Sequence, residues 1–108
     1  MKEKITFDEF SKLDIKIGQI KEAERVPESD KLIKLQVDLG EETRQVVAGF
    51  GKFFQPEELL GVQVPVVVNM SPVKLMGVES NGMVLAVDPG GLVLLTPDED
   101  VPNGSVVR

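Results

Sequence analysis

The chain has 108 residues, of which 42% are hydrophobic and 28% charged, and its net charge is -6. This length suits one domain, residues 1–108, and the composition is that of a folded rather than a disordered protein. The chain has no cysteine and no histidine, which excludes disulfides and thiolate nucleophiles and removes the commonest metal ligand and general base.

No apolar run reaches the roughly 20 residues of a membrane helix, and the N-terminus lacks the pattern of a secretory signal. We therefore predict a cytoplasmic protein without membrane contact, metal or other cofactor. Basic residues are concentrated in residues 1–54, which carry 10 basic and 11 acidic side chains, against 2 and 7 in residues 55–108. A phosphate-binding face can form in the first half, although ordinary solvated charge explains the same composition.

The first expected element is a short helix, because Thr6 and Glu9 have the spacing of a capping box. A long strand over residues 14–26 follows. Its apolar pattern changes phase around Gly18, as in a strand bent at a glycine or a bulge. Bent first strands are typical of small barrels.

The clearest strand covers residues 33–39, where apolar and polar side chains alternate strictly, as in a half-buried strand. A turn at residues 40–42 and a returning strand at residues 43–48 complete a hairpin. Residues 55–61 predict a short helix, with proline at its start and glycine just past its end.

The β-branched run at residues 62–68 contains Pro65, which predicts an edge or bulged strand rather than a central one. Further strands are expected at residues 83–87, 92–95 and 105–107. The order predicts an all-β protein, a five-stranded OB-fold barrel with short helices and added C-terminal strands. An SH3-like barrel is the nearest alternative.

The segment 69–83 joins strands four and five, where an OB fold places a recognition loop. It combines hydrogen-bonding Asn69 and Ser80, a cation at Lys74 and an adaptable apolar side chain at Met83. The structural alternative is that the three methionines of this segment simply cap the barrel.

Several motifs occur in the order found in a known family. They are Asp14-Ile15-Lys16-Ile17-Gly18, Ser29-Asp30-Lys31-Leu32, Val47-Ala48-Gly49, Pro56-Glu57-Glu58-Leu59, Asn69 and Ser80-Asn81-Gly82-Met83. On these motifs the chain resembles, over residues 7–107, the tRNA-binding domain of the methionyl-tRNA synthetase C-terminal type. That family includes a separately encoded synthetase β subunit and a stand-alone protein that recognises tRNA by shape.

The resemblance implies a non-catalytic module that recognises folded tRNA by shape and backbone, as the dimerising C-terminal domain or β subunit of methionyl-tRNA synthetase. The catalytic part of the synthetase would then be a partner. It also implies a homodimer formed through elements added to the barrel, and residues 88–108 are the candidate interface. A related bacterial secretion chaperone leaves open a second hypothesis, a dimeric protein-interaction or chaperone-like module.

The resemblance further implies which residues bind tRNA. The expected positions are Lys16, Lys31, Lys34, Asn69, Lys74, Ser80, Gly82 and Met83. Ser80 and Met83 match tRNA contacts of the family and Gly82 shapes their turn, whereas the lysines would act on phosphates without reading sequence. For each lysine, a solvated surface position is the alternative.

The chain departs from the family pattern within this loop. Ser71 and Val73 stand where many relatives have basic residues, and Asn81 stands where glutamine is usual. The resemblance therefore predicts a lower affinity for tRNA with the same general mode of binding.

The five phenylalanines bear on that mode. Phe7 and Phe10 on the first helix, and Phe50, Phe53 and Phe54 before the second, occupy positions that are more often buried than exposed. Extended stacking of bases on exposed rings is therefore not expected. Recognition of a folded RNA through its backbone and shape fits better.

Catalytic and metal sites are not predicted. Residues 98–100 are acidic but lack the alternating ligand spacing of a calcium loop, and Glu57 and Glu58 suit a helix N-terminus. Without histidine or cysteine, the remaining candidate nucleophiles have no evident activating partner. An enzyme is therefore the least favoured class.

Overall fold

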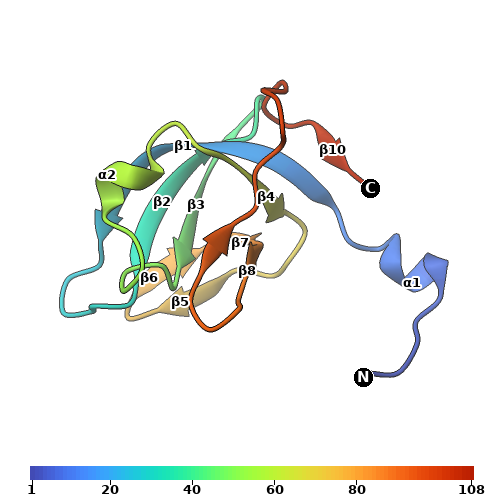
Figure 1. Cartoon of the computed structure of the whole chain (residues 1–108), viewed down its shortest axis with the longest axis horizontal. Helices are drawn as coiled ribbons and strands as arrows, with labels where there is room; N and C mark the ends of the chain where they lie inside the picture. The colour runs from blue at the N-terminus through green and yellow to red at the C-terminus, as the bar shows by residue number, and fades with distance from the viewer.

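The computed structural model describes all of residues 1–108 (Figure 1). The predicted elements occur in the predicted order, with an additional hairpin at residues 73–80, and the strand expected at residues 83–87 is divided into two strands of different sheets. The helices are α1 (Phe7–Phe10) and α2 (Pro56–Leu59). The strands are β1 (Ile15–Arg25), β2 (Ile33–Asp38), β3 (Thr43–Ala48), β4 (Gln63–Val67), β5 (Val73–Leu75), β6 (Val78–Ser80), β7 (Met83–Val84), β8 (Ala86–Val87), β9 (Val93–Leu94) and β10 (Val106–Val107). No helix has the length and apolarity needed to cross a membrane.

The strands form a nearly closed barrel, as predicted. Neighbours in the main sheet are β3, β2, β1, β4 and β7, in that order, and β3 also contacts β6 and β7 across the remaining gap. A backbone hydrogen bond crosses this seam from the Asn81 N–H to the Gln45 carbonyl at 2.8 Å. The all-β, OB-like barrel expected from the sequence is thereby confirmed.

Strand β1 connects the two sides of the barrel. One of its edges pairs with β4, and the other pairs first with β10 and then with β2. A register shift between Ile20 and Glu22 marks a bulge, and a Cβ added at Gly18 would lie 2.4 Å from the Val37 Cγ1. The register shift thus lies beyond Gly18, around which the sequence predicted a bend, whereas at Gly18 itself only glycine allows β1 to pass so close to β2.

Strand β4 is central, so its predicted place at an edge is wrong. It pairs with β1 on one side and β7 on the other, and Pro65 lies opposite Ile17. The Ile17 N–H donates to the Ser105 carbonyl, and the Ile17 carbonyl accepts from the Gly104 N–H. Ile17 therefore needs no hydrogen bond from Pro65, which has no N–H to donate. On the other side the Pro65 carbonyl accepts a hydrogen bond from the Leu85 N–H. Because proline has no N–H, it cannot donate to the Leu85 carbonyl in turn, and β7 ends just before Leu85.

The barrel core is aliphatic, and the alternation predicted for residues 33–39 is confirmed by full burial of Ile33, Leu35 and Val37. The core residues are Ile20, Ile33, Leu35, Val37, Leu39, Val46, Ala48, Phe50, Leu59, Val64, Val66 and Val68. They come from β1 to β4, α2 and adjoining turns. This close-packed core supports the strands that carry the candidate site.

The expected burial of the phenylalanines is wrong for three of them. The capping box of α1 forms as predicted, but the helix buries none of its residues and stands away from the barrel (Figure 1). Phe7 is 80% exposed, Phe10 44% and Phe53 50%, whereas Phe50 is buried and Phe54 half-buried. Within this chain no other element covers the two rings of α1.

The added C-terminal strands are held by a turn that requires glycine. β10 pairs with the start of β1 and β8 pairs with β9. Gly104 has φ 91°, and a Cβ there would lie 2.3 Å from the Leu39 carbonyl oxygen. Backbone, rather than a movable side chain, fills the space.

We expect Gly104→Ala to lower the free energy of unfolding by about 2–3 kcal/mol, from the left-handed backbone and the clash with Leu39. Urea unfolding measures this change. Gly90→Ala is the matched control, because Gly90 has φ 109° but no atom within 4 Å of an added Cβ. Equal losses in the two variants would show that the contact with Leu39 is not rigid.

Candidate nucleic-acid interface

The predicted binding residues lie along a band of the barrel surface. We call this the candidate band; it comprises the β1–β2 loop (residues 26–32), Lys34, residues 69–83, Arg44 and Lys16. The loop and the β5–β6 hairpin lie at the same end of the barrel (Figure 1). Lys34 lines a hollow of about 170 Å³ together with loop residues and Val78 of the hairpin.

Arg44 connects the hairpin to Lys16. It lines one hollow with Glu79 and Asn81 at the base of the hairpin, and a second hollow with Lys16. Shared hollows thus link Lys34 to the hairpin and, through Arg44, the hairpin to Lys16. The structure does not gather the predicted residues into a single pocket.

The two lysines of the loop and β2 differ in their surroundings. Lys31 is exposed, and none of the three ion pairs of the chain involves it. The Ser29 Oγ accepts from the Lys31 and Leu32 N–H groups at 3.3 and 3.1 Å, which shapes the loop from within. Lys34, in contrast, forms a 2.6 Å ion pair with Glu24, so its charge is already offset.

Residues 69–83 contain a β-hairpin that the sequence did not predict. Lys74 of β5 lies opposite Glu79 of β6, and the turn residues Met76 and Gly77 have φ 50° and 80°. Two positive φ values are typical of a type I′ turn. Strands of three residues are too short to show a period, and methionine is an unusual residue at such a turn, so only Gly77 signalled it.

Ser80 is buried, and its hydroxyl is engaged inside the protein. Only 2% of the residue is exposed. Its Oγ accepts from the Val47 N–H at 2.9 Å and donates to the Gly82 carbonyl at 3.2 Å. Ser80 therefore ties the hairpin to β3 across the barrel seam; a direct contact with tRNA stays a prediction.

Gly82 and Met83 follow at the base of the hairpin. Gly82 has φ 140°, and a Cβ there would approach the Val67 carbonyl oxygen to 3.1 Å. Met83 pairs with Val67 and is 43% exposed. The close passage of Gly82 over β4 thus places an accessible, flexible apolar side chain on the candidate band.

Asn69 is also engaged within the chain. Its Oδ1 accepts from the Asp14 N–H at 2.8 Å, and its Nδ2 donates to the Lys12 carbonyl at 2.6 Å. The side chain therefore fixes the entry of β1 against the end of β4. Its predicted contact with tRNA remains untested.

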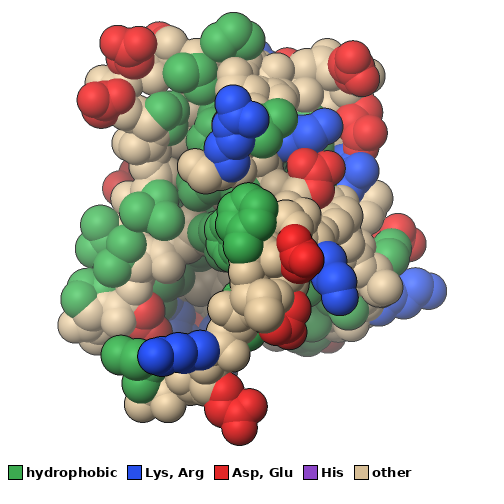
Figure 2. Space-filling model, turned by 90° about the vertical axis from the view of Figure 1, so that its right-hand side faces the viewer, with side chains coloured by type: hydrophobic (Ala, Val, Ile, Leu, Met, Phe, Trp, Pro, Cys, Tyr) green, Lys and Arg blue, Asp and Glu red, His purple; other side chains and the backbone are tan.

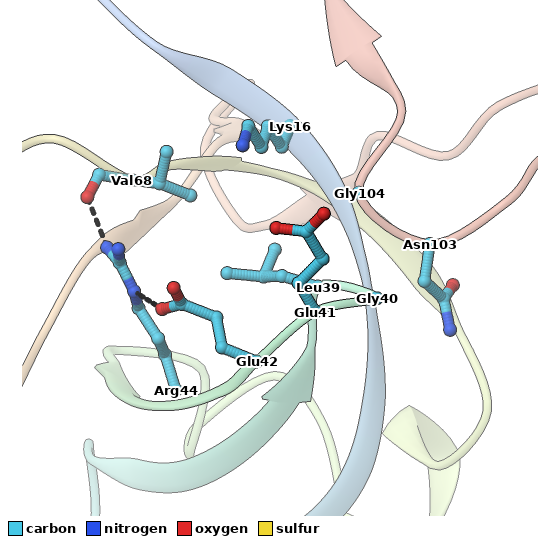
Figure 3. A pocket seen from close by; sticks show the side chains of 9 residues that line it. All are labelled: Lys16, Leu39, Gly40, Glu41, Glu42, Arg44, Val68, Asn103 and Gly104. Atoms are coloured by element: carbon cyan, nitrogen blue, oxygen red, sulfur yellow. Dashed lines mark hydrogen bonds and ion pairs between the residues drawn. The ribbon is translucent and has the colours of Figure 1, made fainter.

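Lys16 overlooks a polar hollow of about 210 Å³, shown in Figure 3. The Arg44 guanidinium in that hollow donates to the Val68 carbonyl and to the Glu42 carboxylate. The hydrogen bond from Arg44 lowers the pKa of Glu42 from its ordinary value. Glu41 also lines the hollow, so two carboxylates accompany the two cations and limit the attraction for a phosphate.

Arg44 is the residue of this surface that the sequence analysis missed. In the sequence it is one of three consecutive polar residues at the start of β3, where no alternation distinguishes it from its neighbours. Only the fold brings it next to Val68, the residue that follows β4, and no local pattern signals that contact.

The candidate band has the composition of a binding surface. Lys31 and Lys74 are exposed cations outside any ion pair, and Met76 and Met83 expose flexible apolar side chains. No group of three or more carboxylate, histidine or cysteine side chains is arranged to hold a metal ion. The band can attract phosphates and pack against an irregular partner.

Comparisons with known proteins show the family to which the chain belongs. The family model described as "Putative tRNA binding domain" matches residues 15–106. The chain is 55% identical over 105 residues to a methionine–tRNA ligase of Methanothrix thermoacetophila and 56% identical over 110 residues to that of Methanococcoides burtonii. These matches cover 96% and 99% of this chain but only 16% of each ligase.

Two solved structures are similar over their full length. The MetRS-related protein of Pyrococcus horikoshii is 41% identical with a TM-score of 0.93, covering 99% of this chain and 100% of that one. The chaperone CsaA of Bacillus anthracis is 36% identical with a TM-score of 0.90, covering 98% and 100%. Barrel, motifs and family model agree, and the chain belongs to the tRNA-binding domain family.

Proposed function

We propose that this chain binds folded tRNA through the candidate band, by shape and backbone, without catalysing a reaction. One observation carries the proposal. The loop that contains the unpaired Lys31 and the hairpin that contains Met76 lie at the same end of a barrel of this family. Lysines act on phosphates as point charges and do not read sequence. A folded RNA, which holds its phosphates in a fixed arrangement, therefore suits the surface better than a single strand.

We further propose that the chain serves a methionyl-tRNA synthetase in the cytoplasm, as its C-terminal region or as a separate β subunit. The similarity to part of two methionine–tRNA ligases supports this. Joined to the catalytic part, the module raises the effective concentration of tRNA without adding catalytic groups.

Gel shifts with tRNA test the binding proposal. We expect Lys31→Ala and Lys74→Ala each to reduce the slope of log affinity against log salt by about 0.7 to 0.9, because each removes one phosphate contact. Met83→Ala should weaken binding at every salt concentration and leave the slope unchanged, because it removes an apolar contact. A linear RNA of the same length is the control for shape. Weak binding that is the same in all variants and both RNAs would contradict the proposal.

The dimer is part of the same proposal. On the face that carries α1 and β10, apolar side chains gather around a hollow (Figure 2). A groove of about 420 Å³ on the barrel is lined by Leu95, Val101, Val106 and other residues of the C-terminal segment. The exposed Phe7 and Phe10 of α1 offer matching apolar surface, so a second copy would cover both.

A second candidate function is a chaperone-like protein-interaction module, which the likeness to the chaperone CsaA favours. Suppression of aggregation of an unfolded test protein would measure it. If the suppression is strong and tRNA does not compete with it, the interaction module is favoured over the tRNA-binding proposal.

A further inference from the structure

We infer that Lys52 is a second phosphate-binding residue, which stands beside Lys31 on one rim of the interface. The rim consists of the β1–β2 loop (residues 26–32) and the segment at residues 50–53. The inference rests on the proposed function, because it assumes an RNA partner. Neither the family motifs nor the charge pattern singled out Lys52.

Gly51 joins the two segments of this rim. Its N–H donates to the Lys31 carbonyl at 2.8 Å, and its carbonyl accepts from the Arg25 Nη1 at 2.9 Å. A Cβ at this position would lie 2.5 Å from the Asp30 carbonyl oxygen, so only glycine allows the approach. Lys52 follows directly, and its backbone is held next to that of Lys31.

The side chain of Lys52 is available to a ligand. It is 53% exposed, and its nearest carboxylate is that of Asp30, which is itself 80% exposed and 3.8 Å away. An exposed pair with this spacing contributes little to stability. The ammonium group can therefore exchange Asp30 for a phosphate, unlike Lys34 with its 2.6 Å pair to Glu24.

Two ammonium groups on one braced rim suit neighbouring phosphates of an RNA strand. Arg25 does not compete for this role, because its guanidinium bonds to the Gly51 carbonyl and the Gln55 Oε1. It braces the rim from the barrel side. Backbone hydrogen bonds fix the positions of Lys31 and Lys52 relative to each other. Their charges are therefore placed more closely than two flexible side chains on separate loops would be.

The test measures tRNA affinity against salt for Lys52→Ala, Lys31→Ala and the double variant, with Lys4→Ala as a control of equal charge change in the exposed N-terminal segment. Each rim variant is expected to reduce the salt slope by about 0.7 to 0.9, and the double variant by twice that. Lys4→Ala should leave the slope within error of the wild type. If the wild type binds tRNA but Lys52→Ala has the same salt slope as Lys4→Ala, the inference about Lys52 is overturned and the proposed function stands.

Asp30→Asn provides an independent arm. The amide keeps the shape of the side chain and removes the carboxylate that faces Lys52, so we expect tRNA affinity to rise by about threefold at low salt. An unchanged or lower affinity overturns the inference. If the wild type fails to bind tRNA even at low salt, the proposed function falls and the inference falls with it.

Discussion

Ser80→Ala is expected to lower the free energy of unfolding by about 1–3 kcal/mol, because it leaves the buried Val47 N–H without its acceptor. The loss weakens the link between the hairpin and β3. We therefore also expect faster amide hydrogen exchange at Val47 and weaker tRNA binding. Urea unfolding and hydrogen exchange measure the first two effects, and gel shifts measure the third.

Ser71→Ala is the matched control for this substitution. Ser71 is exposed in the same segment and forms no hydrogen bond that the change would remove, so its stability and hydrogen exchange should stay near those of the wild type. If Ser80→Ala keeps full stability and the wild-type exchange at Val47 but loses tRNA affinity, Ser80 contacts the RNA directly. That result would contradict the role of Ser80 in tying the hairpin to β3.

Replacing Phe7 and Phe10 together by serine is expected to dissociate the proposed homodimer. Burial of each ring contributes about 1.5–3 kcal/mol, so the double change should raise the dissociation constant by at least about two orders of magnitude. Because α1 buries no residue within its own chain, the stability of the barrel should not change. Analytical ultracentrifugation over a range of concentrations measures the dissociation constant.

Leu60→Ser is the control for this variant, because Leu60 is 50% exposed beside α2, on the side of the barrel away from α1 (Figure 1). It should leave the dimer intact. A double phenylalanine variant with the dissociation constant of the wild type would exclude α1 from the interface. A wild type that stays monomeric at high concentration would reject the dimer itself.

The sequence predicted most of the architecture because the relevant signals are local. Strict alternation in residues 33–39 identified a strand with one buried face, and the Thr6 and Glu9 spacing identified the start of α1. The phase change around Gly18 indicated an irregular first strand, and the register shift of β1 lies a little further along, between Ile20 and Glu22. Each of these patterns depends on neighbours within a few residues, so it is visible without the fold.

The site was harder to predict, because the roles of its residues depend on contacts between distant segments. Ser80 has the polarity of a ligand-binding residue, yet the fold places its hydroxyl on Val47 of β3. Asn69 is similar, because both ends of its amide are used by the start of β1. Neither engagement leaves a trace in local spacing.

By itself, the sequence determined the all-β barrel, the family and the basic residues that are candidates for binding phosphate. Only the tertiary structure decided that Pro65 is central, that Phe7 and Phe10 are exposed, and that Lys52 stands beside Lys31. The physical reason is the same in each case. Burial, strand neighbours and the spacing of charges depend on contacts between residues that are distant in the sequence. Periodicity and capping, in contrast, act within a single element.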